Sequence, residues 1–279
     1  MGRLNMRLGQ SSGGALTAGQ SEVLATMTLT SGVVLTSAPV IHKPASVSDF
    51  STRPAGWTPI SPVATSALTY ADNVVFAAGG MTLKADKQMY MQEDTGFQSS
   101  PSGIFLPLHP GLDSLDATIT VDSFSFSGLA VGQYAYVGIS VFSEVLGELG
   151  GYCAARVFYS VSDATHWFAT KRYKRPNDRQ GITDGASAHT IQAGATPVIG
   201  AQSIRLLMAN GLRTFQAYLG ETELGGSTCP AGAVDWTRND TDPSYDTWGT
   251  GPLALVIEFG TSGNSSPTSS VRVTDLTVA

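Results

Sequence analysis

A short basic segment has the residue types of a binding surface. Five basic residues fall within nine positions, 171–179, of a chain whose formal net charge is −6. Aromatic residues stand beside them, and cations next to aromatic rings suit an anionic glycan, a phosphate-bearing polymer or an acidic neighbouring subunit. The residues of this candidate patch are Trp167, Lys171, Arg172, Tyr173, Lys174 and Arg175. The alternative is a solvated hairpin tip whose charges protect a sheet edge.

An aspartate-rich segment offers the oxygen ligands of a calcium site. Asp240, Asp242 and Asp246 stand at alternate positions with Ser244 between them, as in the first half of a calcium loop. Tyr245 occupies the position where such a loop needs glycine, and no glutamate closes a twelve-residue loop. Aspartates also form local turns through their own side chains. Calcium is therefore a candidate cofactor, with simple turn formation as the alternative.

Two tryptophans, Trp236 and Trp248, flank the aspartate-rich segment. If their rings were exposed on a loop, they could stack on sugar rings and would form a candidate carbohydrate site. If they were buried, they would anchor a long connection instead. The pattern favours burial over exposure.

No motif in the chain specifies a catalytic chemistry. The sequence has no H-E-x-x-H, no G-x-S-x-G, no phosphate-binding loop and no cluster of cysteine with histidine. Its four histidines are scattered singly along the chain. We therefore predict that the protein is not an enzyme and assign no catalytic residue.

Three long strands are expected at residues 117–127, 134–143 and 151–161. Each segment alternates apolar with small or polar residues, which is typical of a sheet with one face in a core. Short breaks containing glycine separate them and predict an antiparallel meander. In the first strand the apolar phase switches at Asp122-Ser123, which predicts a bulge. Cys153 shares the phase of Ala155 and Val157, which favours a buried thiol over a disulfide.

The composition predicts an all-β protein. Only 14% of the residues are charged and 31 are glycine, as expected of extended structure with many turns. Asn210-Gly211 between two apolar runs predicts a further hairpin. More than ten antiparallel strands in about 230 residues exceed what one open sheet carries, so we expect a two-sheet jelly-roll sandwich.

The domain organisation is expected to be an arm followed by one domain. Residues 1–45 are glycine- and serine-rich at first and then only weakly patterned, so we predict an extended N-terminal attachment arm. The alternative is that residues 23–35 supply edge strands to the main domain. Residues 46–279 form the predicted jelly-roll domain. The N-terminus lacks a continuous apolar segment, which argues against a secretory signal peptide.

Several local patterns resemble the concanavalin A-like lectin/glucanase superfamily. They are Trp57 near the domain start, the early strand of Met81, Leu83 and Ala85, the hairpin of residues 203–218 and the closing strand of residues 270–278. The resemblance covers residues 50–279 and implies a jelly roll. The glucanase branch of that superfamily carries E-x-D-x-x-E on one strand, and this chain has no such triplet. The nearest acidic pair, Glu144 and Glu148, is expected in a turn.

These features together favour a non-enzymatic structural or adhesive protein of a bacteriophage virion, such as a head decoration, spike or tail-fibre component. The arm would bind other virion proteins, and the jelly roll, as a homo-oligomer, would contact a cell-surface glycan or neighbouring subunits. The net acidic charge argues against nucleic acid as a partner. The sequence contains no apolar stretch of about 18 residues, so no membrane insertion is predicted. A free carbohydrate-binding module is the first alternative, and a divergent glycosidase is the second.

Overall fold

The structure is a computed structural model of the whole chain. It describes residues 24–29, 33–39, 43–60, 73–85, 101–109, 111–126, 128–143, 151–161, 167–174, 183–184, 189–192, 199–226, 229–237, 253–262 and 269–279. Side chains are described for these residues except 24–39, 143, 183–184 and 192. Arg175, Asp240, Asp242, Asp246 and Trp248 lie outside the described residues.

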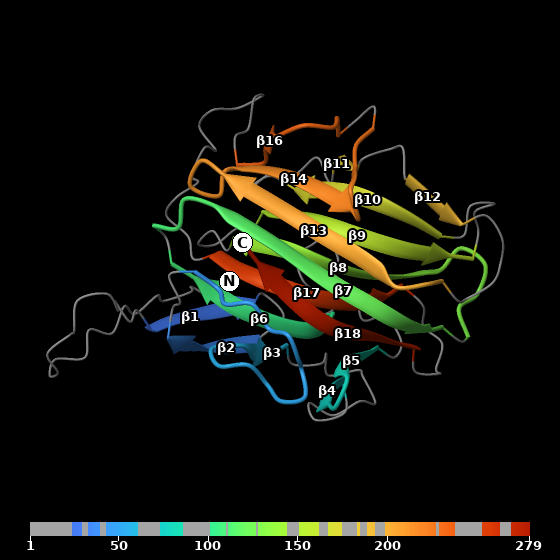
Figure 1. Cartoon of the computed structure of the whole chain (residues 1–279), viewed down its shortest axis with the longest axis horizontal. Coiled ribbons are helices and arrows are strands. Elements are labelled where there is room, and N and C mark those ends of the chain that lie inside the picture. The colour runs from blue at the N-terminus through green and yellow to red at the C-terminus, as the bar shows by residue number, and fades with distance from the viewer. Residues whose placement is uncertain are drawn as a thin grey trace, which may run out of the picture.

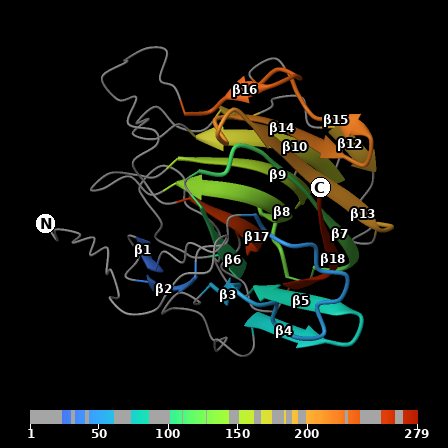
Figure 2. The same cartoon turned by 60° about the vertical axis from the view of Figure 1, so that its left-hand side comes forward.

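Two antiparallel sheets face each other, with eight strands assigned to each over the described residues (Figure 1). The front sheet runs in the order β15-β14-β13-β7-β18-β5-β4, with β16 beside β14. Its strands are β4 (Val74–Ala77), β5 (Gly80–Ala85), β7 (Leu115–Ser125), β13 (Gln202–Ala209), β14 (Thr214–Leu219), β15 (Thr222–Glu223), β16 (Val234–Asp235) and β18 (Ser269–Val278). A view turned by 60° separates the two layers (Figure 2).

The rear sheet runs in the order β11-β10-β9-β8-β17-β6-β3, with β12 beside β10. Its strands are β3 (Thr58–Pro59), β6 (Ser102–Leu108), β8 (Tyr134–Ser143), β9 (Tyr152–Ser160), β10 (Trp167–Lys174), β11 (Thr183–Asp184), β12 (His189–Gln192) and β17 (Leu253–Thr261). No described helix is long and apolar enough to cross a membrane. The prediction of an all-β, two-sheet sandwich is confirmed.

One hydrophobic core fills the space between the sheets, because alternation along each strand turns every second side chain inward. In β7, Ile119 and Val121 are fully buried, while Thr118 and Thr120 on the other face are partly exposed. Burying one such aliphatic side chain contributes roughly 1.5–3 kcal/mol. Cys153 is buried in the same core as a free thiol, as predicted.

The predicted meander is wrong at its first connection. β8 and β9 are antiparallel neighbours, as expected, but β7 lies in the front sheet between β13 and β18. The chain therefore crosses from one sheet to the other after β7, and Gly128 and Gly132, both with positive φ, lie in that connection. A period of two shows that a segment is a strand, but the same period occurs in both sheets and does not identify the partner.

The predicted bulge in β7 is confirmed. Ser123 pairs with Arg272 and Val121 pairs with Val273, so Asp122 is the extra residue between two paired positions. The insertion shifts the phase and lets Phe124 face inward beside Trp167 at 5.1 Å between ring centroids. The displaced Asp122 carboxylate accepts two hydrogen bonds from Arg272, at 2.8 and 2.7 Å.

The hairpin predicted at Asn210-Gly211 joins β13 to β14, with a longer turn than expected. β14 begins at Thr214, and Asn210, Gly211 and Leu212 all have positive φ, of 56°, 67° and 63°. The sequence pattern places Leu212 in the strand. It adopts the left-handed conformation instead, and its side chain is buried in the core.

Near the N-terminus, β1 (Leu24–Leu29) and β2 (Val33–Pro39) pair with each other in a two-stranded sheet that joins neither large sheet. The division into an arm of residues 1–45 and a domain of residues 46–279 stays a prediction. Val47, just after that boundary, exchanges backbone hydrogen bonds with Leu276 of β18, at 2.7 and 2.8 Å. The segment after residue 45 is thus fastened to the front sheet.

The rear sheet is buried on both faces. All nine residues of β9 and all nine of β17 are buried, and so are all seven of β6. The alternation along residues 151–161 predicts only one face in a core. The outward side chains of these strands are mostly apolar or aromatic. Five of them, Phe105, Tyr152, Ala154, Ala254 and Val256, form a second hydrophobic cluster with Ile60 and with Phe142 of β8.

Candidate functional site

A row of small and charged residues crosses the outer face of the rear sheet. The strand register places Gly103 of β6, Glu258 of β17, Gly138 of β8, Arg156 of β9 and Thr170 of β10 side by side. All belong to the phase that points away from the core between the sheets, because their neighbours along each strand are core residues. We call this set the polar row.

Glu258 is the centre of the polar row and is fully buried. Its Oε1 accepts hydrogen bonds from Ser140 Oγ and from Arg156 Nε, both at 3.0 Å, and lies 2.9 Å from Arg156 Nη2. Tyr136 Oη donates to Oε2 at 3.4 Å. A buried carboxylate is tolerated only when it is paired and hydrogen-bonded, and this one is both.

Arg156, which is 1% exposed, is held between two aromatic rings. Its guanidinium carbon lies 4.5 Å from the ring centroid of Tyr136 and 5.0 Å from that of Tyr152. Cation–π contacts strengthen when the charge is desolvated. The guanidinium is therefore fixed in position by rings as well as by Glu258.

Glycines on both sides of Glu258 make room for this arrangement. A Cβ atom at Gly138 would lie 2.6 Å from Arg156 Cγ and 2.4 Å from the Ala155 carbonyl oxygen. A Cβ atom at Gly103 would lie 2.1 Å from the Ile257 carbonyl oxygen. Only glycine permits such close approach within a sheet. Gly138 thus lets the Arg156 side chain lie across β8 to reach the carboxylate.

The polar row has a chemically distinct region on each side. Toward Phe105 and Phe142 lies the apolar cluster described above. On the other side, the rings of Phe158 and Phe168 stack with centroids 5.2 Å apart and an angle of 1° between their planes. The Arg172 guanidinium lies 5.2 Å from the Phe158 centroid. The charged centre is thus enclosed by apolar and aromatic groups, which strengthens electrostatic interactions there.

This arrangement can perform proton transfer. A carboxylate fixed by three side chains and shielded from water can accept or donate a proton at a defined point. Double-displacement hydrolysis of a glycoside needs two carboxyl groups about 5–5.5 Å apart. Among the described side chains, Glu258 is the one carboxylate on the outer face of the rear sheet, so the described residues do not place two carboxyl groups together there.

The structure separates the residues of the predicted basic patch. Trp167, Lys171 and Tyr173 point into the core, whereas Arg172 and Lys174 point to the outer face, because consecutive residues of β10 alternate. Lys171 Nζ donates to the carbonyl oxygens of Pro230 and Gly232, at 3.1 and 2.6 Å. Burial lowers the pKa of Lys171. These bonds show Lys171 fastening the segment that precedes β16.

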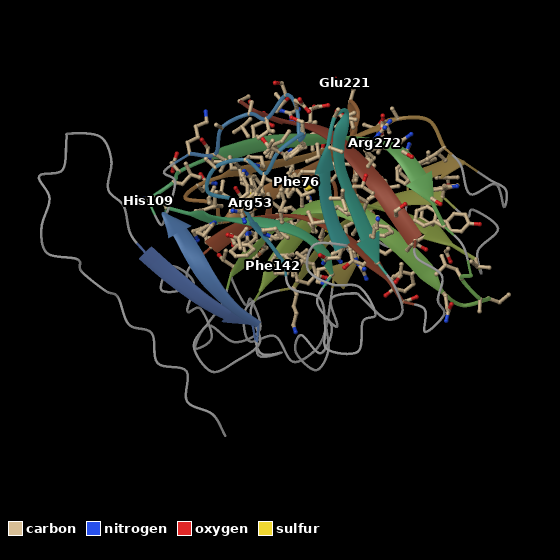
Figure 3. The ribbon with its side chains drawn as sticks, turned by 90° about the horizontal axis from the view of Figure 1, so that it is seen from below. Arg53, Phe76, His109, Phe142, Glu221 and Arg272 are labelled. Carbon is tan, nitrogen blue, oxygen red and sulfur yellow. The ribbon has the colours of Figure 1, made fainter. Side chains whose placement is uncertain are left out.

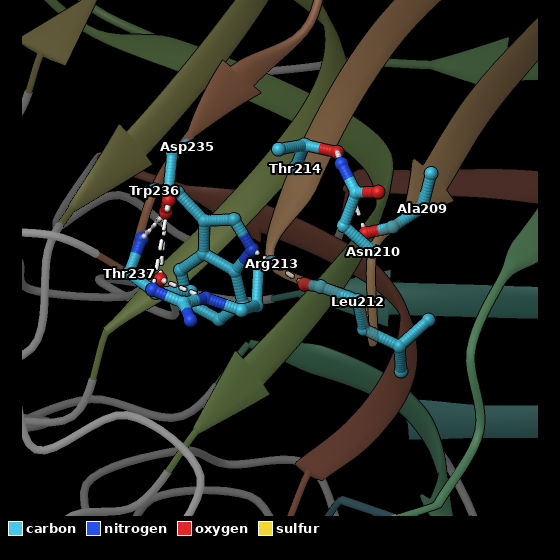
Figure 4. A network of polar contacts seen from close by, with 8 residues as sticks. All are labelled: Ala209, Asn210, Leu212, Arg213, Thr214, Asp235, Trp236 and Thr237. Carbon is cyan, nitrogen blue, oxygen red and sulfur yellow. Dashed lines mark hydrogen bonds and ion pairs between the residues drawn. The ribbon is translucent and has the colours of Figure 1, made fainter.

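Trp236 is fully buried, as the favoured alternative expected. Its Nε1 donates to the carbonyl oxygen of Leu212 at 3.0 Å, which joins it to the turn between β13 and β14 (Figure 4). Beside it, Asp235 Oδ1 accepts hydrogen bonds from the Thr237 backbone NH at 2.9 Å and hydroxyl at 2.6 Å. Trp236 therefore anchors a turn. Binding by the patch residues stays a prediction for Arg172 and Lys174, and Arg175 and Trp248 lie outside the described residues.

The calcium prediction stays open, because Asp240, Asp242 and Asp246 lie outside the described residues. Within the described part of the chain, no three histidine, cysteine, aspartate or glutamate side chains gather to hold a metal ion.

Sequence reasoning missed the polar row. The clean alternation of Leu253, Leu255, Ile257 and Phe259 predicted a strand but drew attention to its inward residues. The available signal was Glu258, a single charge in the opposite phase whose strand neighbours in that phase, Ala254 and Val256, are apolar. Pairing with Arg156 could not be read from the sequence, because the two residues are 102 positions apart.

No protein-family model matches the chain, and no curated protein matches it. Several solved structures do match the chain. An endo-β-galactosidase from Clostridium perfringens that releases GlcNAcα1-4Gal is 11% identical with a TM-score of 0.51, over 84% of this chain and 62% of that one. A β-glucanase from Bacillus licheniformis is 10% identical with a TM-score of 0.44, over 85% and 98%. An alginate lyase is 13% identical with a TM-score of 0.45, over 85% and 97%.

The endo-β-galactosidase, at a TM-score of 0.51, supports the predicted jelly roll at the level of fold. The prediction that the protein is not an enzyme is contradicted, because this solved structure of the same fold is an enzyme that acts on a carbohydrate. That prediction rested on the absence of local catalytic motifs in the sequence, whereas the polar row draws its residues from five strands. Nothing in the comparisons supports a virion component.

Proposed function

We propose that the protein is a carbohydrate-active enzyme whose reaction centre is the polar row, with Glu258 as its acid–base carboxylate. One observation carries the proposal: a fully buried, charged Glu258 stands among apolar side chains, where it is held by Ser140, Arg156 and Tyr136. The shared fold with an endo-β-galactosidase, at a TM-score of 0.51, supports a glycan as substrate.

The energetic argument starts from the cost of burying charge. Replacing a buried ion pair by apolar residues of similar volume is often neutral or stabilising by about 1–4 kcal/mol. The outer face of the rear sheet already has apolar side chains around the pair, so stability alone does not require Glu258 and Arg156. Residues that fix a buried charge at one point are expected where chemistry needs it, since preorganised electrostatics supply much of enzymatic catalysis.

Each residue of the centre has a role that follows from its contacts. Glu258 exchanges a proton with the glycan. Arg156 and Ser140 hold the carboxylate by Oε1. Tyr136 contacts Oε2 at the longer distance of 3.4 Å, so Oε2 is the more available oxygen. Arg156 is a positioning residue, because its guanidinium acts through Glu258.

The burial of the centre has a kinetic consequence. Since Glu258 and Arg156 are at most 1% exposed, a saccharide reaches them only when the outer face of the rear sheet opens. When association requires a conformational change, its rate constant falls below the usual range of about 10⁵–10⁷ M⁻¹ s⁻¹. We expect slow, single-exponential binding of oligosaccharides in stopped-flow experiments.

The proposal is tested by assaying the purified protein against neutral and acidic polysaccharides, with products detected by reducing-end assay, by absorbance of unsaturated sugars and by mass spectrometry. Glu258→Gln should lower the rate by about 10²–10⁴-fold, as expected for a lost general acid or base. Tyr136→Phe removes one hydroxyl at 3.4 Å and keeps the ring against Arg156, so a folded variant is available if Glu258→Gln unfolds.

Glu221→Gln is the matched control, because Glu221 is exposed and lies on the side of the front sheet, away from Phe142 on the outer face of the rear sheet (Figure 3). It should leave activity unchanged. If wild-type protein cleaves none of these glycans, or if Glu258→Gln is folded and fully active, the proposal fails.

A further inference from the structure

The outer face of the front sheet carries two ion pairs with the same geometry. Arg205 donates from Nε and Nη2 to the two carboxylate oxygens of Asp116, both at 2.7 Å. Arg272 donates in the same way to Asp122, at 2.8 and 2.7 Å. This bidentate mode uses one edge of each guanidinium and leaves the NH groups of Nη1 and the outer NH of Nη2 for another acceptor. The two pairs therefore allow their surroundings to be compared directly.

An aromatic ring distinguishes Arg205 from Arg272. The guanidinium carbon of Arg205 lies 5.1 Å from the ring centroid of Tyr218, which is directly opposite it on β14. Among the described residues, no aromatic ring makes such a contact with Arg272. A guanidinium that is bound to a carboxylate and also lies over a ring has little freedom left. Arg205 is thus fixed before a ligand arrives, which lowers the entropic cost of binding.

A pocket of about 340 Å³ lies beside Arg205 on this face. Hydroxyl side chains from three strands line it. Thr118 of β7 is in register with Arg205 on one side and with Thr277 of β18 on the other, and Ser203 comes two residues before Arg205 on β13. The volume falls within the range of about 300–1,000 Å³ that is typical of small-molecule sites. The pocket can therefore hold a small polar ligand.

The hydroxyls that line the pocket differ from their neighbour outside it. None of these three hydroxyls makes a hydrogen bond among the described residues, whereas the Thr120 hydroxyl donates to Asp275 at 3.1 Å. Exposed hydroxyls bind water, so the lack of a protein partner does not make a site by itself. Here three such hydroxyls line one pocket together with the unused NH groups of the fixed Arg205.

The charges around the pocket favour a neutral ligand. Asp116 neutralises Arg205, and Glu221, an exposed residue of the lining, adds a second carboxylate. An anion would be repelled by these two carboxylates, and a cation would have to lie beside the guanidinium. A neutral ligand that both donates and accepts hydrogen bonds matches the NH groups and the hydroxyls. Neighbouring hydroxyl groups of a sugar have this character.

We propose that the pocket beside Arg205 binds a neutral saccharide by two neighbouring hydroxyl groups. The Arg205 NH groups that Asp116 leaves unused donate to the sugar oxygens, and the hydroxyls of Thr118 and Ser203 exchange hydrogen bonds with the sugar. Glu221 has no contact with the sugar in this arrangement. The pocket is on the front sheet, whereas the polar row is on the outer face of the rear sheet. The inference therefore goes beyond the proposed function and does not depend on it.

The test is a nuclear magnetic resonance titration of the ¹⁵N-labelled full chain with cellobiose, lactose and mannobiose, and with digalacturonate as the anionic comparison. Mass spectrometry of the recovered sugar checks for cleavage. At least one neutral disaccharide should bind with a millimolar Kd and shift the Nε–H signal of Arg205 and the amide signals of β7 and β13. Digalacturonate should bind about tenfold or more weakly.

Arg205→Lys tests the donor fork. Lysine keeps a positive charge beside Asp116 but lacks the planar set of NH groups, so affinity for the disaccharide should fall about tenfold or more. Arg272→Lys is the matched control, because it changes an ion pair of the same geometry on the same face. It should leave the affinity unchanged.

Thr118→Val distinguishes binding from folding. The substitution removes a hydroxyl without a described partner, so urea unfolding should show equal or higher stability, while affinity should fall about 3–10-fold. Thr120→Val is its control on the same strand. That variant loses the hydrogen bond to Asp275, so its stability should fall while its affinity for the sugar stays unchanged.

Four results would overturn the inference. They are the absence of binding by every neutral disaccharide, equal binding of digalacturonate, equal affinities of Arg205→Lys and Arg272→Lys, and shifts confined to signals of the rear sheet. Glycerol serves as a further comparison, and if it shifted the Arg205 signal as strongly as the sugars, the contact would be adventitious and the inference would fail. A shift at Arg205 without turnover of any glycan would support this site and refute the proposed function.

Discussion

The strongest test of the polar row is a double-mutant cycle on Glu258 and Arg156. Removing one partner of a buried ion pair leaves an uncompensated charge and costs about 3–5 kcal/mol. Both residues are at most 1% exposed, and Oε1 of Glu258 lies 2.9 Å from Arg156 Nη2, so the full penalty applies to each. Glu258→Leu and Arg156→Met should each lower the free energy of unfolding by this amount. A domain is typically stable by only about 5–15 kcal/mol, so either change is severe.

The double variant should recover most of that loss. In the double variant, Glu258→Leu with Arg156→Met, the new side chains would lie in an apolar environment that already holds Val256 and Phe105. The free energy of unfolding should therefore be close to that of wild type. The coupling free energy is the loss in the double variant minus the sum of the losses in the two single variants. With a loss near zero in the double variant and about 3–5 kcal/mol in each single variant, it is about −6 to −10 kcal/mol.

The assay is urea unfolding followed by tryptophan fluorescence, with the slope of unfolding free energy against urea checked in all four proteins. Single losses below about 1 kcal/mol that simply add would refute the description of a desolvated, mutually dependent pair. The double variant should also be folded but inactive on any glycan that the wild-type protein cleaves. That combination would show that the pair serves function at the expense of stability.

Four further outcomes are expected from the contacts described. Gly138→Ala should destabilise the protein by at least about 1–3 kcal/mol and lower its activity, because the new methyl group would collide with the Arg156 side chain. Urea unfolding measures the loss of stability, and turnover of a glycan measures the loss of activity. Trp236→Phe should cost about 1–3 kcal/mol in urea unfolding without altering glycan affinity, because a buried carbonyl loses its donor. Burial lowers the pKa of Lys171 below its value of 10.5 in the unfolded chain, so the unfolded chain binds more protons between these two values. Stability should therefore rise as pH increases through this range, and Lys171→Met should remove the rise. Burial raises the pKa of Cys153, so alkylation by iodoacetamide should be as slow as global unfolding, and fast labelling in native buffer would contradict its position in the core.

The sequence predicted local structure well where a single physical cause determines it. The bulge at Asp122 followed from a phase switch, because a strand that is to bury Val121 and Phe124 on the same face must contain an extra residue. The hairpin at Asn210-Gly211 followed from residues that tolerate positive φ. The extension of that turn to Leu212 was not predictable, since a leucine adopts this conformation only because its side chain gains burial in the core.

The candidate site was not predictable, because it depends on which strands become neighbours. Glu258 and Arg156 are joined through β8, and neither residue carries a local pattern that identifies the other. The basic segment did draw attention to β10. Alternation along that strand then divided its residues, so that Lys171 supports the fold while Arg172 stays on the face that we assign to the glycan.

Burial of β9 and β17 on both faces limits how this protein can vary. In β7 of the front sheet, every second residue from Asp116 to Thr120 is partly exposed, so about half of the positions there should accept substitution. In β9 and β17 no position is exposed, and a change in either phase disturbs packing or the polar row. Saturation mutagenesis should therefore show tolerance with a period of two along β7 and almost none along β9 and β17. The rear sheet would then diverge most slowly among descendants of this chain, and the front sheet would record most of their differences.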